Sequence, residues 1–300
     1  MSRLEVEFLD KVMKNPIVVA SGTYGFGTEY SNYYSPSILG GICSKGITLN
    51  KKIGNDGIRI WESSCGLINS IGLENPGIED FIINHMEEIN NINTMKIVNL
   101  GGNTLDDYIT AIEILNKHEI DLIELNISCP NVKEGGMAFG LNAKSAGEIT
   151  AKVKKKSRHN IMVKLSPNAE NIVEVAKACE NSGADAFSLV NTFQAMAIDI
   201  NERKPVFENI YAGLSGPAIK PIALRMVHQV SKNVHVPVMG IGGIMNWKDA
   251  LEFIMAGATC VQMGTANFVD PYAPVKTIDD LEGYCIENKI ENIMELIGII

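Results

Sequence analysis

The chain has 300 residues, of which 46% are hydrophobic, and its formal net charge is −9. That length and apolar content suffice for one large core, and we expect a single domain over residues 1–300. The acidic balance argues against nucleic-acid binding, and six cysteines without a Cys-x-x-Cys pair argue against a zinc site or a disulfide framework.

The N-terminal segment, Met1 to Phe8, carries acidic residues where a secretory signal peptide needs a basic start followed by an apolar run. No later segment supplies the roughly 18 uninterrupted apolar residues of a membrane-spanning helix. The scattered cysteines are typical of a reducing compartment. We therefore expect a soluble, cytoplasmic protein that binds no membrane.

Short apolar runs bounded by glycine, proline, asparagine or serine recur along the chain and predict strands. They are Ile17–Ala20, Ile42–Gly46, Lys96–Leu100, Leu122–Ile127, Ile161–Leu165, Ala186–Val190, Pro237–Ile241 and Thr259–Met263. Helical periodicity fills the segments Leu105–Lys117, Ala143–Lys155, Ala169–Asn181, Ala218–Ser231 and Trp247–Ala256. Strands that alternate with helices predict parallel βαβ units. Eight strands of nearly continuous apolar character favour a closed (β/α)8 barrel, the TIM barrel, over an open sheet.

Two connections in this pattern are long, Leu49–Glu79 after the second strand and Asn191–Gly216 after the sixth. A third long loop follows the fourth strand. Loops of this length in a compact domain are usually functional.

Polar or glycine residues stand at the C-terminal end of every predicted strand, where barrel enzymes place their catalytic groups. In chain order they are Ser21, Lys45, Asn99, Asn126, Lys164, Asn191, Gly242 with Gly243, and Gly264 with Thr265. Lys45 and Lys164 lie within apolar strands, where a cation needs an anionic partner. That partner is either a bound ligand or a barrel carboxylate such as Glu124.

The late glycines leave backbone N–H groups open to a ligand, and TIM barrels commonly bind a phosphate at the loops after strands seven and eight. Ordinary tight turning is the alternative.

Cys129 follows the end of the fourth strand and precedes Pro130. A lone cysteine is most often an inert buried hydrophobe. This context, with Gly135-Gly136 close by, instead favours a thiol over the barrel mouth that acts as a nucleophile or proton acceptor.

Taken together, the chain resembles the family-1 dihydroorotate dehydrogenases over nearly its full length. The segments that carry the resemblance are SGTYGFGTEY (21–30), SKGITL (44–49), INSIGLENPG (68–77), NISCPNVKEGG (126–136), VKLSPN (163–168), GLSGPAIKPIALR (213–225), GIGGI (240–244) and QMGTA (262–266).

The resemblance implies an FMN site, a dihydroorotate site and a base. FMN would be surrounded by Ser21, Lys45, Gly46, Asn99, Asn126, Lys164, Val190, Gly216, Gly242, Gly243, Gly264 and Thr265, of which the last four would hold its phosphate. Dihydroorotate would contact Lys45, Asn69, Ser70, Ile71, Gly72, Leu73, Asn126, Asn191 and Thr192. Cys129 would be the catalytic base that removes the C5 proton of the substrate. Lys164 would stabilise negative charge on the reduced flavin ring.

Within the family, the segments INSIGLENPG, KEGG and GLSGPAIKPIALR look like the B type. Its catalytic subunit works with a second subunit that carries FAD and a 2Fe–2S cluster and passes electrons to NAD⁺. This implies a homodimer that joins the electron-transfer subunit in a heterotetramer. The chain has neither the cysteine spacing of an iron–sulfur site nor a strand followed by G-x-G-x-x-G, which agrees with NAD⁺ binding elsewhere. The same absence is compatible with an A-type enzyme that uses fumarate.

Two further hypotheses lie outside this family. A phosphate-binding barrel aldolase would use Lys164 as a Schiff-base nucleophile and the late glycines for its substrate phosphate. A barrel kept as a scaffold in a larger complex would show no dihydroorotate-dependent bleaching of a flavin.

Overall fold

In the computed structural model, which describes residues 2–127 and 139–300, eight parallel strands close into a barrel. The strands are β3 (Ile17–Val19), β4 (Gly41–Cys43), β7 (Met95–Leu100), β8 (Leu122–Asn126), β9 (Ile161–Lys164), β10 (Ala186–Leu189), β15 (Val238–Ile241) and β16 (Cys260–Met263). They follow one another around the barrel in chain order, and β16 pairs with β3 to close it. The predicted (β/α)8 barrel is confirmed, and each predicted strand overlaps an observed one.

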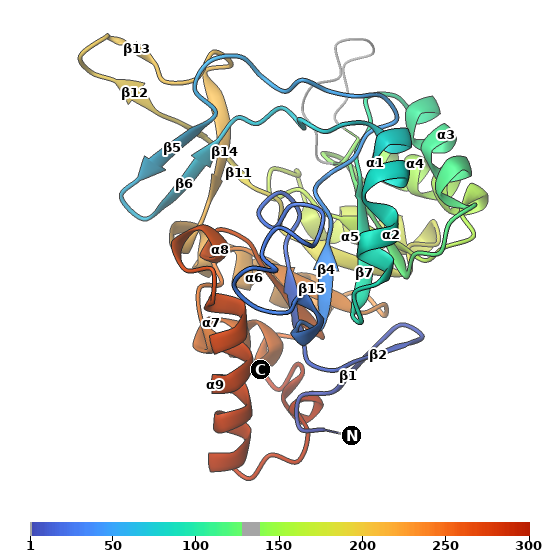
Figure 1. Ribbon diagram of the computed structural model, residues 1–300, viewed down its shortest axis with the longest axis vertical. Coiled ribbons are helices and arrows are strands. Elements are labelled where there is room, and N and C mark those ends of the chain that lie inside the picture. The colour runs from blue at the N-terminus through green and yellow to red at the C-terminus, as the bar shows by residue number, and fades with distance from the viewer. Residues whose placement is uncertain (1, 128–138) are drawn as a thin grey trace.

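Helices cover the outside of the barrel, so its strands are buried on both faces (Figure 1). The helices are α1 (Ile78–Asn84), α2 (Met86–Asn90), α3 (Leu105–Leu115), α4 (Ala143–Lys156), α5 (Ile172–Asn181), α6 (Lys220–Ser231), α7 (Trp247–Met255), α8 (Ala266–Val269) and α9 (Ala273–Glu287). Side-chain caps fix several starts: Thr104 forms a capping box with Asp107, and Asn142, Asn171 and Asn246 accept from the first backbone N–H groups of α4, α5 and α7. Short 3-10 helices cover Pro36–Ile38, Pro217–Ile219 and Ile293–Leu296.

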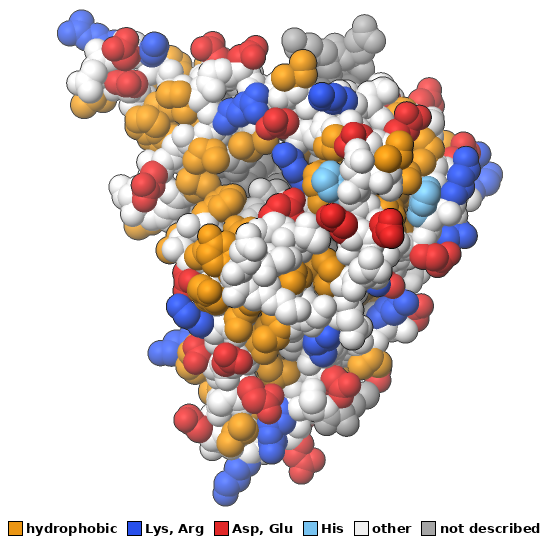
Figure 2. All heavy atoms as spheres, viewed as in Figure 1, with side chains coloured by type: hydrophobic (Ala, Val, Ile, Leu, Met, Phe, Trp, Pro, Cys, Tyr) orange, Lys and Arg blue, Asp and Glu red, His pale blue; other side chains and the backbone are white. Residues whose placement is uncertain are grey.

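The two longest predicted loops instead fold together. They contain β5 (Ile60–Ser63), β6 (Gly66–Asn69), β11 (Phe193–Met196) and β14 (Tyr211–Ser215), which form an antiparallel sheet in the order β11-β14-β6-β5. A small hairpin, β12 (Ile198–Asp199) with β13 (Lys204–Pro205), extends from it. In Figure 2, hydrophobic side chains gather over this sheet at the upper left. The sequence predicted long loops here but not this sheet, because its central pairing joins β6 to β14, strands far apart in sequence.

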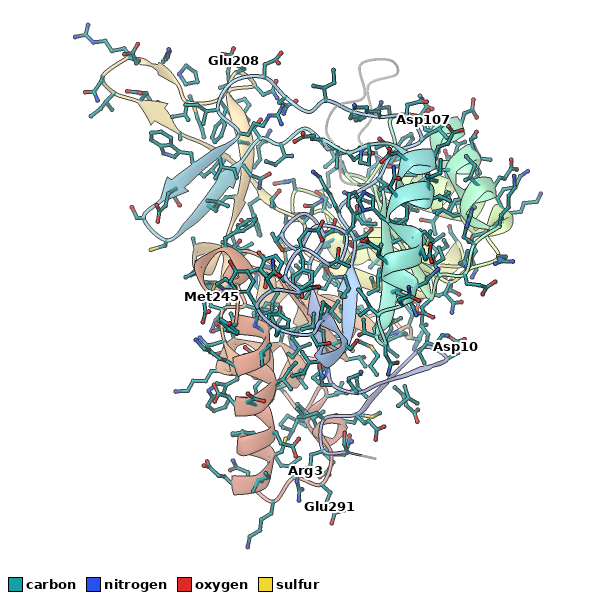
Figure 3. The ribbon with its side chains drawn as sticks, viewed as in Figure 1. Arg3, Asp10, Asp107, Glu208, Met245 and Glu291 are labelled. Atoms are coloured by element: carbon teal, nitrogen blue, oxygen red, sulfur yellow. The ribbon has the colours of Figure 1, made fainter. Side chains whose placement is uncertain are left out.

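A hairpin of β1 (Val6–Phe8) and β2 (Lys11–Met13) lies at the N-terminal end of the barrel strands. Its residues reach the segments that lead into three of those strands, since Lys11 pairs with Asp121, Asn160 donates to Asp10 and Met13 contacts Cys260. In Figure 3, Asp10 marks the turn of this hairpin in the lower part of the view, whereas Glu208, between β13 and β14, and Asp107, in α3, lie in the upper part.

Among the described residues, no helix combines the length and the apolar character that crossing a membrane requires.

Candidate active site

The C-terminal ends of the barrel strands bring the predicted polar residues to one mouth. The register places Asn99 opposite Glu124 and Asn126 opposite Lys164, on three consecutive strands. Ser188, on the next strand, lies opposite Lys164. Asn99, Asn126 and Lys164 are all buried, so the floor of the mouth is polar although it is shielded from water.

Lys164 has a protein partner on this floor. Its Nζ lies 3.5 Å from Oε1 of Glu124, whose side chain is completely buried. The ion pair with a barrel carboxylate, which the sequence left open for both lysines, is therefore realised for Lys164. The pair keeps two opposite charges inside the barrel, where a single charge would be costly.

Lys45 differs from Lys164. Its backbone N–H donates to the carbonyl oxygen of Gly25 at 2.7 Å, which fixes the chain where it leaves β4. In the described part of the chain, no carboxylate lies within ion-pair distance of its Nζ. The half-buried ammonium is therefore available to an anionic ligand.

The rim on one side of the mouth consists of amides held against one another. Asn191 Nδ2 donates to Oδ1 of Asn126 at 3.3 Å, and the backbone N–H of Thr192 donates to Oδ1 of Asn191 at 2.8 Å. Asn69, at the end of β6, donates to the carbonyl oxygen of Gly213 at 3.1 Å. The antiparallel sheet thus places Asn69 beside β14, the strand that lies between β6 and β11.

The other predicted substrate contacts divide into two groups. Leu73 reaches the mouth, since its Cδ2 would lie 3.5 Å from a Cβ added at Gly46. The hydroxyl of Ser70 instead accepts from Nδ2 of Asn55 at 3.0 Å, and the carbonyl oxygen of Ile71 accepts from the backbone N–H of Asn55. Gly72 adopts a φ of 73°, which turns the chain between these two groups.

The glycine loops on the opposite side of the mouth lie in close contact. A Cβ on Gly243, whose φ is 73°, would lie 2.8 Å from the carbonyl oxygen of Gly216. A Cβ on Gly216 would lie 3.5 Å from Cγ2 of Thr265, so the three loops meet. Across the described residues, no protein acceptor receives the backbone N–H groups of Gly243, Gly264 or Thr265. These donors form a cradle that suits a phosphate.

Two features of the floor and the cradle fit FMN. Asn99 Oδ1 is buried and has no hydrogen-bond donor in the described structure, so it can accept from the N–H of a flavin pyrimidine edge. The unpaired backbone donors of the glycine loops suit the flavin phosphate. The predicted FMN residues Ser21 and Val190 follow β3 and β10 at the same mouth, and the Val190 N–H donates to the carbonyl oxygen of Ile241.

Cys129 lies outside the described residues, as does the rest of the segment 128–138. Its strand, β8, ends at Asn126 on the floor of the mouth. The role predicted for the thiol therefore stays a prediction.

The buried polar side chains that surround Glu124 beneath the mouth were not predicted from the sequence. Gln262 donates to Oε2 of Glu124 at 2.8 Å, and the Cys43 thiol donates to Oε1 at 3.4 Å. Burial, followed by the nearby Glu124 carboxylate, raises the pKa of Cys43 well above its ordinary value, so this thiol stays protonated. The signal was present in the sequence, because a glutamate and a glutamine interrupt apolar strands at positions that face the barrel interior.

Comparison with known proteins agrees with this geometry. The sequence model of the dihydroorotate dehydrogenase family matches residues 3–284. A protein of Petrotoga mobilis named dihydroorotate dehydrogenase B (NAD(+)), catalytic subunit, is 54% identical over 96% of both chains. Proteins of the same name from Brachyspira hyodysenteriae and Bacteroides thetaiotaomicron are 52% and 47% identical, each over 99% of both chains.

Proposed function

The chain belongs to the dihydroorotate dehydrogenase family, and from this premise we propose that it oxidises dihydroorotate to orotate in de novo pyrimidine (UMP) synthesis. We take residues 1–300 as one catalytic domain. The observation that carries the proposal is the convergence of a buried cation, an unpaired acceptor and a cradle of backbone donors on one barrel mouth, in a chain that matches the family over residues 3–284. The same match argues against the aldolase and scaffold alternatives.

FMN is the cofactor of this chain. Bound at the mouth, it would accept a hydride from C6 of the substrate. Asn99 Oδ1 and Lys164 would hold its pyrimidine edge on the floor. The backbone N–H groups of Gly242, Gly243, Gly264 and Thr265 would hold its phosphate. Ser21, Lys45, Gly46, Asn126, Val190 and Gly216 complete the proposed site.

The substrate would lie between this floor and the amide rim. Asn69, Asn126 and Asn191 offer neutral donors and acceptors to the ring and carboxylate of dihydroorotate. Lys45 would supply the positive charge that pairs with the carboxylate. Ser70, Ile71, Gly72, Leu73 and Thr192 would enclose the remaining edge, with Leu73 excluding water.

The proposed base is Cys129, which lies shortly after β8 in the sequence. Cys129 follows Asn126 by three positions, and Asn126 is the last residue of β8. The thiolate would take the C5 proton of dihydroorotate and become a neutral thiol. One group thus removes a proton from one face of the substrate while the hydride leaves from C6.

The catalytic subunits of the B-type relatives, which are named for NAD⁺, point to the electron route. We propose that this chain pairs with a second subunit that carries FAD and a 2Fe–2S cluster and reduces NAD⁺. Two catalytic chains and two such subunits would form a heterotetramer in the cytoplasm. An A-type enzyme would instead pass its electrons to fumarate.

Anaerobic mixing tests the proposal. The purified chain, reconstituted with FMN, should lose its flavin absorbance when dihydroorotate is added, and orotate should form in equal amount. NAD⁺ or fumarate alone should restore the absorbance slowly, whereas NAD⁺ with the partner subunit should restore it rapidly. A chain that binds FMN but is not bleached by dihydroorotate would contradict the assigned substrate.

A further inference from the structure

A single carboxylate organises the polar layer beneath the mouth. Glu124 lies in the middle of β8, and its side chain is 0% exposed. Its Oε1 accepts from Asn99 Nδ2 at 2.6 Å and lies 3.5 Å from Lys164 Nζ. Its Oε2 accepts from Gln262 Nε2 at 2.8 Å. Donors on four other strands therefore converge on one side chain, because Cys43 also donates to it.

This arrangement keeps Glu124 charged. Burial by itself raises the pKa of a carboxyl group, but the Lys164 ammonium and the hydrogen bonds from Gln262 and Asn99 outweigh it, and the pKa of Glu124 lies below its ordinary value. The carboxylate is thus an acceptor only, and each neighbouring amide must turn its NH₂ group toward it.

The orientation of Asn99 follows from this constraint. Its Nδ2 is committed to Glu124, so its Oδ1 is the atom that faces away from the carboxylate. That oxygen would lie 2.8 Å from a Cβ added at Gly46, the residue that follows Lys45 at the mouth. A side chain at position 46 would cover the oxygen, whereas glycine leaves it open. Within the described residues, this buried oxygen has no donor.

We propose that Glu124 is a positioning residue: it presents Asn99 as an acceptor and holds the Lys164 ammonium beside it, so that the floor of the mouth matches a ring edge with an N–H group between carbonyl oxygens. The inference rests on the proposed function, since the pyrimidine edge of FMN has this pattern. Glu124 itself touches no ligand. It acts through Asn99 and Lys164, and it also sets the net charge under the ring.

The alternative is that Glu124 only stabilises the barrel. Both roles predict that Glu124→Gln lowers stability, because the ion pair loses its negative charge and an NH₂ donor replaces one of the two acceptor oxygens of the network. Only the positioning role predicts a change in the relative affinity of the site for oxidised and reduced FMN. The midpoint potential of bound FMN therefore distinguishes the positioning role from a purely stabilising role.

Glu124→Gln should shift the midpoint potential of bound FMN to more positive values. The variant removes the negative charge that Glu124 places 3.5 Å from Lys164 Nζ, which favours the more negatively charged reduced flavin. We expect affinity for reduced over oxidised FMN to rise about tenfold, which corresponds to about 30 mV for a two-electron couple. Glu124→Asp keeps the charge and should stay near the wild-type potential.

Asp185→Asn is the matched control. Asp185 pairs with Lys154 at 2.5 Å on the outside of the barrel, so the variant also loses one lysine–carboxylate pair. It should lower stability and leave the FMN potential unchanged. Equal potentials in wild type, Glu124→Gln and Asp185→Asn would overturn the positioning role. A shift in Glu124→Asp as large as that in Glu124→Gln would also overturn it.

A measurement without flavin keeps the inference separable from the proposed function. In the wild-type apoprotein, NMR of the assigned Asn99 side-chain amide should show one strongly downfield proton, and the Glu124 carboxyl carbon should report an ionised group at neutral pH. An unperturbed Asn99 amide or a protonated Glu124 would overturn the inference even if FMN binds. If the wild-type chain binds no FMN, the proposed function fails, while these signals still test the orientation of Asn99.

Discussion

The two ends of the barrel are formed by the same eight strands but differ in the side chains that they bury. At the N-terminal end, the β1–β2 hairpin covers the strands with apolar side chains, among them Val6, Phe8 and Met13, all at most 2% exposed. At the C-terminal end, Glu124 and Lys164 are buried at a cost that a stability-driven core avoids. The closed end therefore serves stability, whereas the buried charges of the other end agree with the ligand site that we propose there.

The largest effect is expected at the polar end. Cys129→Ser should retain FMN but lower turnover at neutral pH by about 100-fold or more, because a hydroxyl is a far weaker acid than a thiol and supplies almost no ionised base. Rapid anaerobic mixing with dihydroorotate measures the rate of flavin reduction. A rate that matches the wild type would remove Cys129 from the mechanism.

A substitution at the closed, N-terminal end of the barrel should lower stability and leave FMN affinity unchanged. Phe8→Ala removes a fully buried ring from the hairpin and should lower the free energy of unfolding by about 3–5 kcal/mol. Denaturant unfolding measures this loss, and FMN titration below the transition should give the wild-type affinity. A parallel loss of FMN affinity would show that the two ends are not separable.

A substitution in the glycine loops tests whether their backbone donors form the proposed phosphate cradle. In Gly243→Ala, the added methyl group would meet the Gly216 carbonyl oxygen in a backbone of positive φ, at a cost of about 1–2 kcal/mol. We expect FMN affinity to fall about tenfold as the loops separate. Gly283→Ala is the control, since a Cβ there meets nothing within 4 Å and lies in helix α9. It should keep FMN affinity and gain up to about 1 kcal/mol of stability. Equal FMN affinities in the two variants would contradict the cradle.

The smallest expected effect is on the pH dependence of stability. The folded-state pKa of Glu124 lies below its ordinary value of 4.5, so its contribution is present above the unfolded-state pKa and is lost as pH falls through the folded-state pKa. Glu124→Gln lacks this group and should lose less stability between about pH 6 and about pH 3 than the wild type. Phe8→Ala should run parallel to the wild type. Parallel curves for all three proteins would show that Glu124 does not titrate as described.

The sequence predicted the barrel well because each strand carries its own local signal. Runs such as Leu122–Ile127 are mostly apolar and carry a polar residue near their C-terminal end, and this run differs little from the observed β8. The ends of these predicted runs also placed Asn99, Asn126 and Lys164 at strand ends, and the structure brings the three residues together. The resemblance, rather than any local pattern, assigned them to FMN.

Other features depend on pairings that no local pattern reveals. The sheet that joins β6 to β14 brings Asn69 next to Gly213, although neither segment looks like a core strand in sequence. The contact of Glu124 with Gln262 crosses the barrel interior, and only closure of the barrel brings them together. The orientation of the Asn99 amide depends in turn on that carboxylate, so it follows from three-dimensional packing alone.

A crystal structure of the chain with FMN and orotate would locate both ligands relative to the barrel mouth. We expect the flavin phosphate at the loops of Gly243 and Thr265, its pyrimidine edge on Asn99 Oδ1 and Lys164, and the sulfur of Cys129 against the face of orotate that points away from the flavin. A flavin bound away from this floor, or a Cys129 sulfur out of reach of the orotate ring, would contradict the proposed site.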